Sequence, residues 1–252
     1  MAISVSGVSC GYGKKTVLFD FSASFEKGQI TCITGPNGCG KSTLLKTVVG
    51  SVVPFSGKVF VDDALVSKPV ERAKKIAFLP QGKEVSDMTV FETVLHGRFP
   101  HLSFPRVYCE KDRKKAFLCL ESMGLSHLCD SPVSTLSGGM RQKVYIAMAL
   151  CQDTEYILLD EPTTYLDISN VFELFDTIKK LAQSGKGIVL VLHDLVTALQ
   201  FSDRVLVMNE GKNIFFGSPD DLVEAGVIKD VFGVGISKRD GSYFYERSAK
   251  NG

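Results

Sequence analysis

The feature that most constrains the fold is a glycine-rich loop, Gly35-Pro36-Asn37-Gly38-Cys39-Gly40-Lys41-Ser42. Residues 29–34 before it read as a strand, and residues 43–49 after it read as the opening of a helix. Glycines at this spacing let successive backbone N–H groups turn inward on an oligophosphate, where the helix N-terminus adds positive potential. In this pattern Lys41 would reach the β- and γ-phosphates, and the Ser42 hydroxyl would ligate Mg²⁺. The alternative is a structural turn with a chance Lys-Ser pair.

Hydrophobic patterns along the 252 residues alternate between strand and helix. Strands are expected at residues 17–25, 57–61, 76–79, 155–159 and 187–192, a hairpin at 204–208 and 213–216, and a helix at 171–181. The alternation in the first strand places four side chains on one face, namely Phe19, Phe21, Ala23 and Phe25. Near-continuous apolar strands that alternate with helices predict an α/β fold with a parallel sheet covered on both faces.

From about residue 85 to residue 152 the pattern becomes helical, which indicates a second lobe. A helix from Glu110 to Met123 is expected to end at Gly124, since glycine is a common C-terminal stop. Its apolar residues are Phe117, Leu118, Leu120 and Met123.

Composition narrows the class of partner and compartment. Lys and Arg number 29 against 28 Asp and Glu, for a net charge of +1, and basic runs are short, so nucleic acid is not expected as a partner. No apolar stretch approaches the roughly 18 residues that a membrane span requires. The N-terminus lacks the pattern of a secretion signal. Seven cysteines, without close pairs typical of zinc sites, suit a reducing compartment, so a soluble intracellular chain is expected.

Two carboxylates end the expected strand at 155–159. Asp160 and Glu161 would lie at the carboxyl edge of the sheet, beside the glycine-rich loop. There Asp160 could hold Mg²⁺ through water, and Glu161 could accept a proton from an attacking water. A strand that ends in Asp-Glu is common by itself, so this interpretation depends on the loop.

A second glycine motif, Leu136-Ser137-Gly138-Gly139-Met140, precedes another expected helix. Ser137, Gly138 and Gly139 could form a second anion cradle at that helix N-terminus. Either both cradles close on one triphosphate within the chain, or each serves a site shared between two copies. The structural alternative is that Ser137 is an N-cap and the glycines form a tight turn.

In their order along the chain, GPNGCGKST, Gln81, LSGGM, ILLDEPTTYLD and LHD resemble the ATPase subunit of an ATP-binding-cassette (ABC) transporter. The resemblance implies the P-loop NTPase fold of ABC ATPases, with a mostly parallel sheet core, an antiparallel β subdomain and a helical subdomain. It also implies a single domain over residues 1–252. The RecA-like core would comprise residues 1–84 and 153–252, and the helical subdomain residues 85–152.

By the same resemblance, Tyr12 would stack on the adenine of ATP and Gln81 would sense Mg²⁺ and the attacking water. Asp160 would support Mg²⁺, Glu161 would be the general base, and His193 would contact the γ-phosphate. The nucleotide would also contact the loop residues, namely Gly35, Pro36, Asn37, Gly38, Cys39, Gly40, Lys41, Ser42 and Thr43, and the second cradle, namely Ser137, Gly138 and Gly139. Mg²⁺ would be held near Ser42, Gln81 and Asp160. Asp167 would lie in the loop that couples two sites.

The sequence departs from the family pattern at Met140, where the signature motif usually has Gln. The groups that face phosphate are Ser137 and the glycine N–H groups, so activity is expected to survive. Contacts near the ribose are the part that this change puts in doubt.

The resemblance also implies partners. Members of this family form head-to-tail homodimers with ATP between the glycine-rich loop of one chain and the Ser-Gly-Gly loop of the other. Such subunits lie on the cytoplasmic face of the inner membrane, bound to transmembrane permease subunits that receive ligand from an extracytoplasmic binding protein. The segment from Gln81 to His101, including Arg98 and Phe99-Pro100, would receive a short cytoplasmic helix of the permease.

Residues 88–101, the EPTTYLD form of the loop and residues 227–233 are similar to importers of iron-siderophore, haem and cobalamin chelates. Zinc or manganese importers and vitamin importers are the nearest alternatives. Non-transport ABC ATPases usually carry two cassettes or a long coiled coil, and neither pattern is present here. A purely structural nucleotide-binding module would be expected to lack the catalytic carboxylate, yet Glu161 is present.

Overall fold

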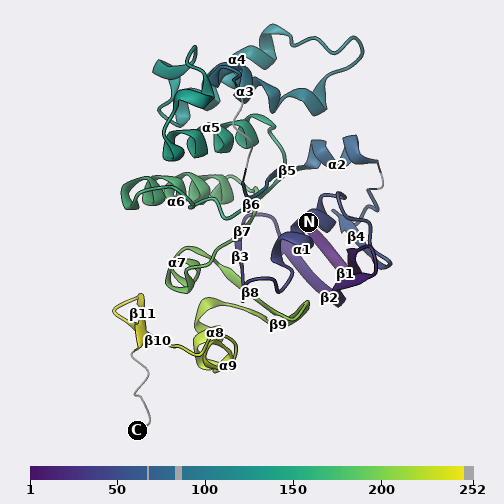
Figure 1. The fold of residues 1–252 in the computed structure, drawn as a ribbon, viewed down its shortest axis with the longest axis vertical. Helices are drawn as coiled ribbons and strands as arrows, with labels where there is room; N and C mark the ends of the chain where they lie inside the picture. The colour runs from purple at the N-terminus through teal and green to yellow at the C-terminus, as the bar shows by residue number, and fades with distance from the viewer. Residues whose placement is uncertain (67, 83–86, 247–252) are drawn as a thin grey trace.

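The computed structural model describes residues 1–66, 68–82 and 87–246. A six-stranded sheet with the strand order β5-β6-β7-β3-β8-β9 crosses its centre (Figure 1). Its first five strands run parallel and the last pairs antiparallel to β8. The bounds are β5 Ile76–Leu79, β6 Tyr156–Asp160, β7 Gly187–Val191, β3 Ile30–Thr34, β8 Arg204–Asn209 and β9 Lys212–Gly217. The prediction of a mostly parallel sheet is confirmed.

A smaller antiparallel sheet with the order β2-β1-β4 lies to one side of the central sheet (Figure 1). Its strands are β1 Ala2–Tyr12, β2 Lys15–Glu26 and β4 Ser56–Val61, and a C-terminal hairpin consists of β10 Gly235–Arg239 and β11 Ser242–Glu246. The helices are α1 Lys41–Val48, α2 Pro69–Lys75, α3 Val90–His96, α4 Glu110–Ser122, α5 Gly138–Cys151, α6 Ile168–Gln183, α7 Leu195–Phe201, α8 Pro219–Glu224 and α9 Val227–Phe232. Strand β1 and the C-terminal hairpin were not among the elements expected from the sequence.

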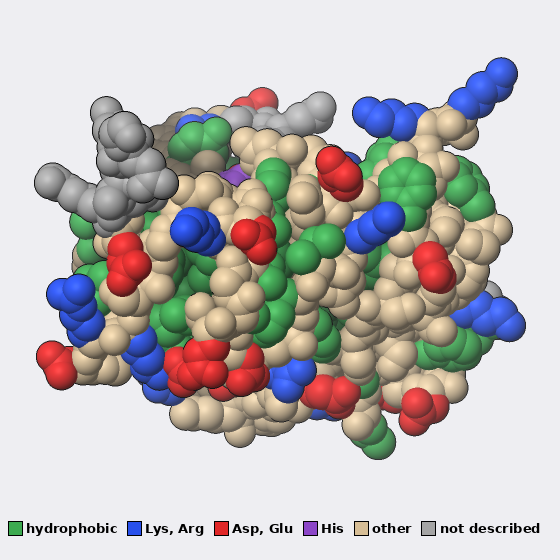
Figure 2. Space-filling view, turned by 90° about the horizontal axis from the view of Figure 1, so that it is seen from below, with side chains coloured by type: hydrophobic (Ala, Val, Ile, Leu, Met, Phe, Trp, Pro, Cys, Tyr) green, Lys and Arg blue, Asp and Glu red, His purple; other side chains and the backbone are tan. Residues whose placement is uncertain are grey.

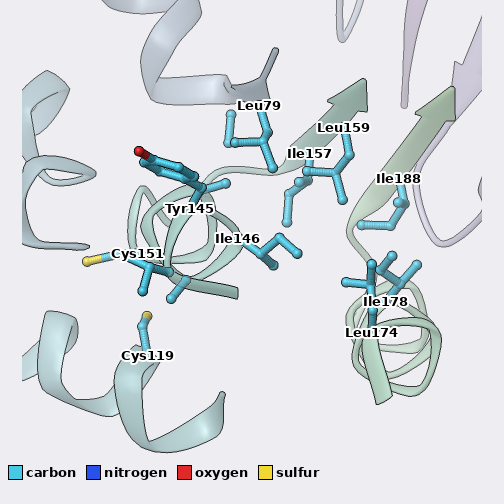
Figure 3. Close-up of a cluster of buried hydrophobic side chains, with 14 of the residues drawn as sticks. Leu79, Cys119, Tyr145, Ile146, Cys151, Ile157, Leu159, Leu174, Ile178 and Ile188 are labelled. Carbon is cyan, nitrogen blue, oxygen red and sulfur yellow. The ribbon is translucent and has the colours of Figure 1, made fainter. Parts of the chain in front are cut away.

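Helices cover both faces of the central sheet. Every residue of β3, β6 and β7 is buried, as the apolar strands predicted. Figure 3 shows α5 packed between α4 and the sheet, with Ile146 facing Ile157 of β6. On the other face, α1 packs in one hydrophobic cluster with the antiparallel sheet, which fixes the glycine-rich loop between the two sheets.

One strand differs from its predicted pattern. Phe21 and Phe25 of β2 are buried, but Phe19 is 45% exposed and Leu18 is buried instead. The pairing of β1 with β2 is irregular between Val8 and Gly11, and Asp20 has a positive φ of 46°. Such a bulge shifts the alternation by one residue, so Leu18 and Phe21 both point inward.

The helical lobe at the top of Figure 1 consists of α3, α4 and α5. Helix α4 ends as expected, since Gly124 has a left-handed φ of 68° directly after the C-cap residue. Its predicted apolar face is partly wrong, because Phe117 and Leu118 are exposed. The buried face instead contains Asp112, Ala116, Cys119 and Leu120, at the spacing of one helix face. The expected boundary between residues 84 and 85 lies outside the described residues.

The surface mixes charges of both signs. Figure 2 shows acidic and basic side chains interspersed on the lower face of the molecule, separated by small hydrophobic areas. Within the described ranges, no helix has both the length and the apolar character that crossing a membrane requires.

Candidate active site

The glycine-rich loop joins β3 to α1, as predicted. A Cβ atom on Gly35 would lie 2.1 Å from the Met208 carbonyl oxygen, and one on Gly40 would lie 2.8 Å from the Leu18 side chain. Both glycines also have positive φ, of 153° and 110°. Only glycine fits at these two positions, because the backbone here runs against β8 and β2 without room for a side chain.

The helix that follows presents its N-terminus to the loop. Its N-cap is Gly40, which has no side chain to cap the first N–H groups of α1. The buried Lys41 turns its Nζ back over the loop, where it donates to the carbonyl oxygens of Gly35 (2.7 Å) and Pro36 (3.0 Å). Ser42 and Thr43 follow in the first turn. Uncapped N–H groups and an ammonium on one loop are an arrangement that can hold an anion.

Cys39 does not face the concave side of this loop. Its side chain is 6% exposed and belongs to the hydrophobic cluster beneath the antiparallel sheet. Burial raises the pKa of the Cys39 thiol, although the Lys41 charge acts in the opposite direction. The loop therefore offers backbone groups, not the thiol, to a ligand.

Asp160 ends β6 below the loop and is only 2% exposed. The Ser42 hydroxyl hydrogen-bonds to its carboxylate, while Asp160 Oδ1 is buried without a hydrogen-bond partner in the structure. Burial, followed by the nearby Glu161 charge, raises the pKa of Asp160. A buried carboxylate oxygen without a partner, next to a serine hydroxyl, fits a hard divalent cation such as Mg²⁺.

Glu161 follows Asp160 in a left-handed conformation, with a φ of 52°. Its backbone N–H donates to the Val191 carbonyl (3.1 Å), which holds it at the end of β7. Gln81 Nε2 donates to Glu161 Oε2 (2.6 Å), and His193 Nε2 donates to Glu161 Oε1. The structure thus brings together three predicted residues, Gln81, Glu161 and His193. A positive φ at a non-glycine residue such as Glu161 is typical of functional sites.

The second glycine motif opens α5. Ser137 Oγ accepts a hydrogen bond from the Met140 N–H (3.3 Å), so Ser137 is the N-cap of α5, and Gly138 and Gly139 are the first two residues of the helix. Gly138 lies against Tyr165, because a Cβ on Gly138 would be 3.3 Å from the Tyr165 Cβ. A pocket of about 450 Å³ lies between this turn and the predicted catalytic residues. It is lined by Pro80, Gln81, Gly82, Gly138, Arg141, Gln142, Tyr145, Asp160, Glu161, Thr164 and Tyr165.

Two other predicted residues lie at the ends of elements. Tyr12 is 50% exposed and pairs with Lys15 at the turn between β1 and β2. Further along β2, the side chains of Val17 and Leu18 lie against Gly40 of the glycine-rich loop. Asp167 is the N-cap of α6 and accepts from the Asn170 N–H (2.8 Å). Tyr12 therefore lies at the end of the hairpin whose strand β2 packs against the glycine-rich loop, and Asp167 begins the helix that follows the loop containing Glu161.

Sequence reasoning missed Tyr165 and Gln142. Tyr165 is 78% exposed with a φ of 71°, and Gln142 Nε2 donates to the Pro162 carbonyl (2.9 Å), which ties α5 to the loop after Glu161. Only their position in the sequence could have indicated them, since Tyr165 lies within the ILLDEPTTYLD motif and Gln142 lies just after the LSGGM motif. No periodicity marks them.

Arg98, which belongs to the expected docking segment, does not lie on the surface of that segment. Its side chain is 12% exposed and forms an ion pair with Asp112 (3.1 Å). Arg98 Nη1 also donates to the Cys151 carbonyl at the end of α5 (3.0 Å). The guanidinium thus joins α4 to α5 inside the helical lobe. The exposed side chains nearby are Phe99, Phe104 and Val107.

Comparisons with known proteins find relatives that match most of the chain. A profile of the ABC transporter family matches residues 18–164. The iron(3+)-hydroxamate import ATP-binding protein FhuC of Bacillus subtilis (strain 168) is 39% identical over 236 residues, which cover 92% of this chain and 87% of FhuC.

Two solved structures are similar over most of the chain. A putative metal-chelate type ABC transporter in an inward-facing conformation is 27% identical with a TM-score of 0.82, covering 97% of this chain and 96% of that one. A dimeric ATP-binding cassette bound to ADP and inorganic phosphate is 27% identical with a TM-score of 0.76, covering 86% of this chain and 98% of that one.

Proposed function

The chain belongs to the ABC transporter family, in which it is an ATP-hydrolysing subunit, and we propose that it powers the import of a metal chelate through a membrane permease. The main evidence for ATP hydrolysis is the pair of hydrogen bonds that Gln81 and His193 donate to the Glu161 carboxylate. FhuC and the metal-chelate type transporter support the class of cargo.

In this proposal the concave loop from Gly35 to Thr43 binds the β- and γ-phosphates of ATP through backbone N–H groups. Lys41 exchanges its contacts with Gly35 and Pro36 for phosphate oxygens, since an ammonium pairs more strongly with a charged oxygen than with a carbonyl. Tyr12 stacks on the adenine, from the turn that leads into β2, whose Val17 and Leu18 lie against the loop at Gly40.

Hydrolysis then uses Glu161 as the general base. Glu161 accepts a proton from water as the water oxygen attacks the γ-phosphorus. The bond from the γ-phosphorus to the bridging oxygen breaks, its electron pair leaves with ADP, and inorganic phosphate is released. Gln81 and His193 orient the carboxylate and the γ-phosphate. Ser42 and Asp160 would hold Mg²⁺, which would neutralise charge on the phosphates.

We also propose that two copies act together. Ser137, Gly138 and Gly139 form a helix N-terminus that faces the pocket containing Glu161, yet none of residues 35–43 lines that pocket. A head-to-tail homodimer would place the Ser137 turn of one chain against the nucleotide of the other. The similarity to a dimeric cassette with ADP and phosphate supports this arrangement.

The permease would bind the helical lobe, on the cytoplasmic side of the membrane. The division into a RecA-like core (residues 1–84 and 153–252) and a helical subdomain (residues 85–152) fits this role. Gln81 follows β5 of the core, and Phe99 follows α3 of the lobe. The part of the chain that enters the lobe after Gln81 therefore carries the exposed apolar side chains Phe99, Phe104 and Val107. An extracytoplasmic binding protein would deliver the chelate to the permease.

The test is the variant Glu161→Gln, assayed both as purified protein and in a strain that lacks the gene. The amide cannot accept the proton, so turnover should fall by about 100-fold or more while ATP affinity stays within about threefold. The wild-type gene should restore uptake of a ferric chelate to the deletion strain, and Glu161→Gln should not.

Glu173→Gln is the matched control, because Glu173 lies on the exposed side of α6 and pairs with Lys143. It should retain turnover and restore uptake. Wild-type turnover in Glu161→Gln would contradict the catalytic assignment. Normal ferric chelate uptake in the deletion strain, with loss of zinc, manganese or vitamin uptake, would contradict only the cargo.

A further inference from the structure

The C-terminal hairpin contacts the segment that carries His193. Tyr245 of β11 donates its hydroxyl hydrogen to Asp194 Oδ1 (2.8 Å). The Tyr245 hydroxyl oxygen in turn accepts a hydrogen bond from the backbone N–H of Leu195 (3.2 Å). One phenol thus bridges the two residues that directly follow His193, although it lies about 50 residues further along the chain.

Asp194 is ordered by more than this contact. It is the N-cap of α7, and its Oδ2 accepts from the Thr197 N–H (2.8 Å). Burial acts to raise the pKa of Asp194, but hydrogen bonds from Thr197 and Tyr245 outweigh it and lower the pKa. The carboxylate therefore remains an ionised acceptor, which strengthens the bond from Tyr245.

The segment before His193 is anchored as well. The Leu192 N–H donates to the Ile33 carbonyl (3.2 Å) on β3, the strand that leads into the glycine-rich loop. His193 thus stands between two anchors, β3 on one side and the Tyr245 hydroxyl on the other. Its own side chain is 48% exposed, so close packing of the ring contributes less to its orientation.

The other contacts of the hairpin hold it in place without touching His193. Tyr243, two residues earlier on the same strand, is 6% exposed and packs with Leu195 and Leu199 in a hydrophobic cluster. Its hydroxyl donates to Asp220 (2.7 Å), which lies in the first turn of α8. Tyr243 and Tyr245 therefore each donate to an aspartate, but only Tyr245 reaches the residues beside His193.

We propose that Tyr245 is a positioning residue that fixes the direction of His193 toward Glu161, so that the C-terminal hairpin acts on the rate of ATP hydrolysis. The inference rests on the proposed role of His193. When the hydroxyl is absent, Asp194 Oδ1 and the Leu195 N–H lose a shared partner, and the backbone after His193 gains freedom. Nucleotide binding through Lys41 and the loop is unaffected, because these groups lie on another element.

The experiment compares Tyr245→Phe with Tyr243→Phe in the full chain. Both variants lose a tyrosine–aspartate hydrogen bond, and Tyr243→Phe should lower the melting temperature at least as much as Tyr245→Phe, because Tyr243 is 6% exposed and Tyr245 is 51% exposed. Only Tyr245→Phe should lower kcat, by about tenfold, with KM for ATP within about twofold of wild type. Hydrogen exchange of the peptide that contains Leu195 should also be faster in Tyr245→Phe alone.

His193→Ala separates the inference from the proposed function. If His193→Ala has normal turnover, the role proposed for His193 is wrong. If His193→Ala is slow and Tyr245→Phe has normal kcat, the inference is wrong while the proposed function stands. An equal fall in kcat in both tyrosine variants would also overturn the inference, since it would reflect general loss of stability.

Discussion

At the scale of single residues, the site depends on side chains whose environment differs from what their position suggests. Cys39 lies within the glycine-rich loop, yet its thiol is buried beneath it and its pKa is raised, chiefly by burial. Asp160 is equally buried but keeps one oxygen without a partner. Burial makes the Cys39 thiol unreactive, and the unpartnered oxygen leaves the Asp160 carboxylate available to a cation.

The thiols should therefore react in a definite order. Under native conditions and limiting maleimide, Cys109, which is exposed, should be modified well before Cys39, because the thiolate is the reactive form. ATP turnover should remain normal after this first modification. Peptide mass spectrometry identifies the labelled sites, and Cys109→Ser serves as the control that removes the fast reaction. Rapid labelling of Cys39 with loss of turnover would contradict the buried placement.

At the scale of elements, the helical lobe is joined by a buried ion pair. Arg98 follows α3, pairs with Asp112 in the first turn of α4 and donates to a carbonyl at the end of α5. Burial acts to raise the pKa of Asp112, but hydrogen bonds from Cys109 and Arg98 outweigh it, so the pKa is lowered. Both side chains are at most 12% exposed, so solvent screens this pair only weakly.

Stability should therefore depend on pH through Asp112. Since its folded pKa lies below the unfolded value of about 3.9, its contribution is complete above that value and is lost as the pH falls through the lower folded pKa. Asp112→Asn should lower the free energy of unfolding by about 2 kcal/mol at pH 7. The loss of stability between about pH 5 and pH 3 should be smaller in Asp112→Asn than in wild type.

Chemical denaturation at a series of pH values measures this difference. Asp153→Asn is the control, because Asp153 pairs with Lys115 at an exposed position (3.1 Å; 47% exposed). That substitution should change stability by less than about 1 kcal/mol. Equal effects of both substitutions would contradict the structural role assigned to the Arg98 pair.

At the scale of the whole molecule, two helix N-termini with glycine-rich turns belong to different parts of the fold. The loop before α1 packs in one hydrophobic cluster with both sheets, and Gly138 at the start of α5 lines a pocket together with Asp160 and Glu161 of the core. A single chain thus carries two glycine-rich turns that, in the proposed function, each bind phosphate. In the proposed dimer each nucleotide would use one turn from each chain.

Assembly can be tested with substitutions that keep the cap of α5. On the Glu161→Gln background, Ser137→Asp and Ser137→Asn both retain an oxygen that can accept from the Met140 N–H. Aspartate adds a negative charge against phosphate, so Ser137→Asp should remain monomeric in MgATP, while Ser137→Asn should still dimerise. Size-exclusion chromatography with light scattering measures this, and ATP affinity should be equal in both. Dimerisation of Ser137→Asp to the same extent would contradict the proposed interface.

The sequence by itself determined the local parts of this protein. The glycine-rich loop, the apolar strands that flank it and the carboxylates after β6 follow from spacing, because each depends on neighbours within a few residues. Their combination also indicated the family and the mostly parallel sheet. The alternation in β2 failed at Phe19, since a bulge depends on the pairing of β1 and β2 and not on the strand alone.

Only the tertiary structure decided which distant groups meet. Gln81 and Glu161 are 80 residues apart, and they come together because β5 and β6 are adjacent parallel strands whose carboxyl ends share one edge. Arg98 is inside the lobe because α4 and α5 pack around it, and Tyr245 reaches Asp194 because the hairpin packs on α7. No local pattern encodes these contacts, since each depends on how separate elements pack in three dimensions.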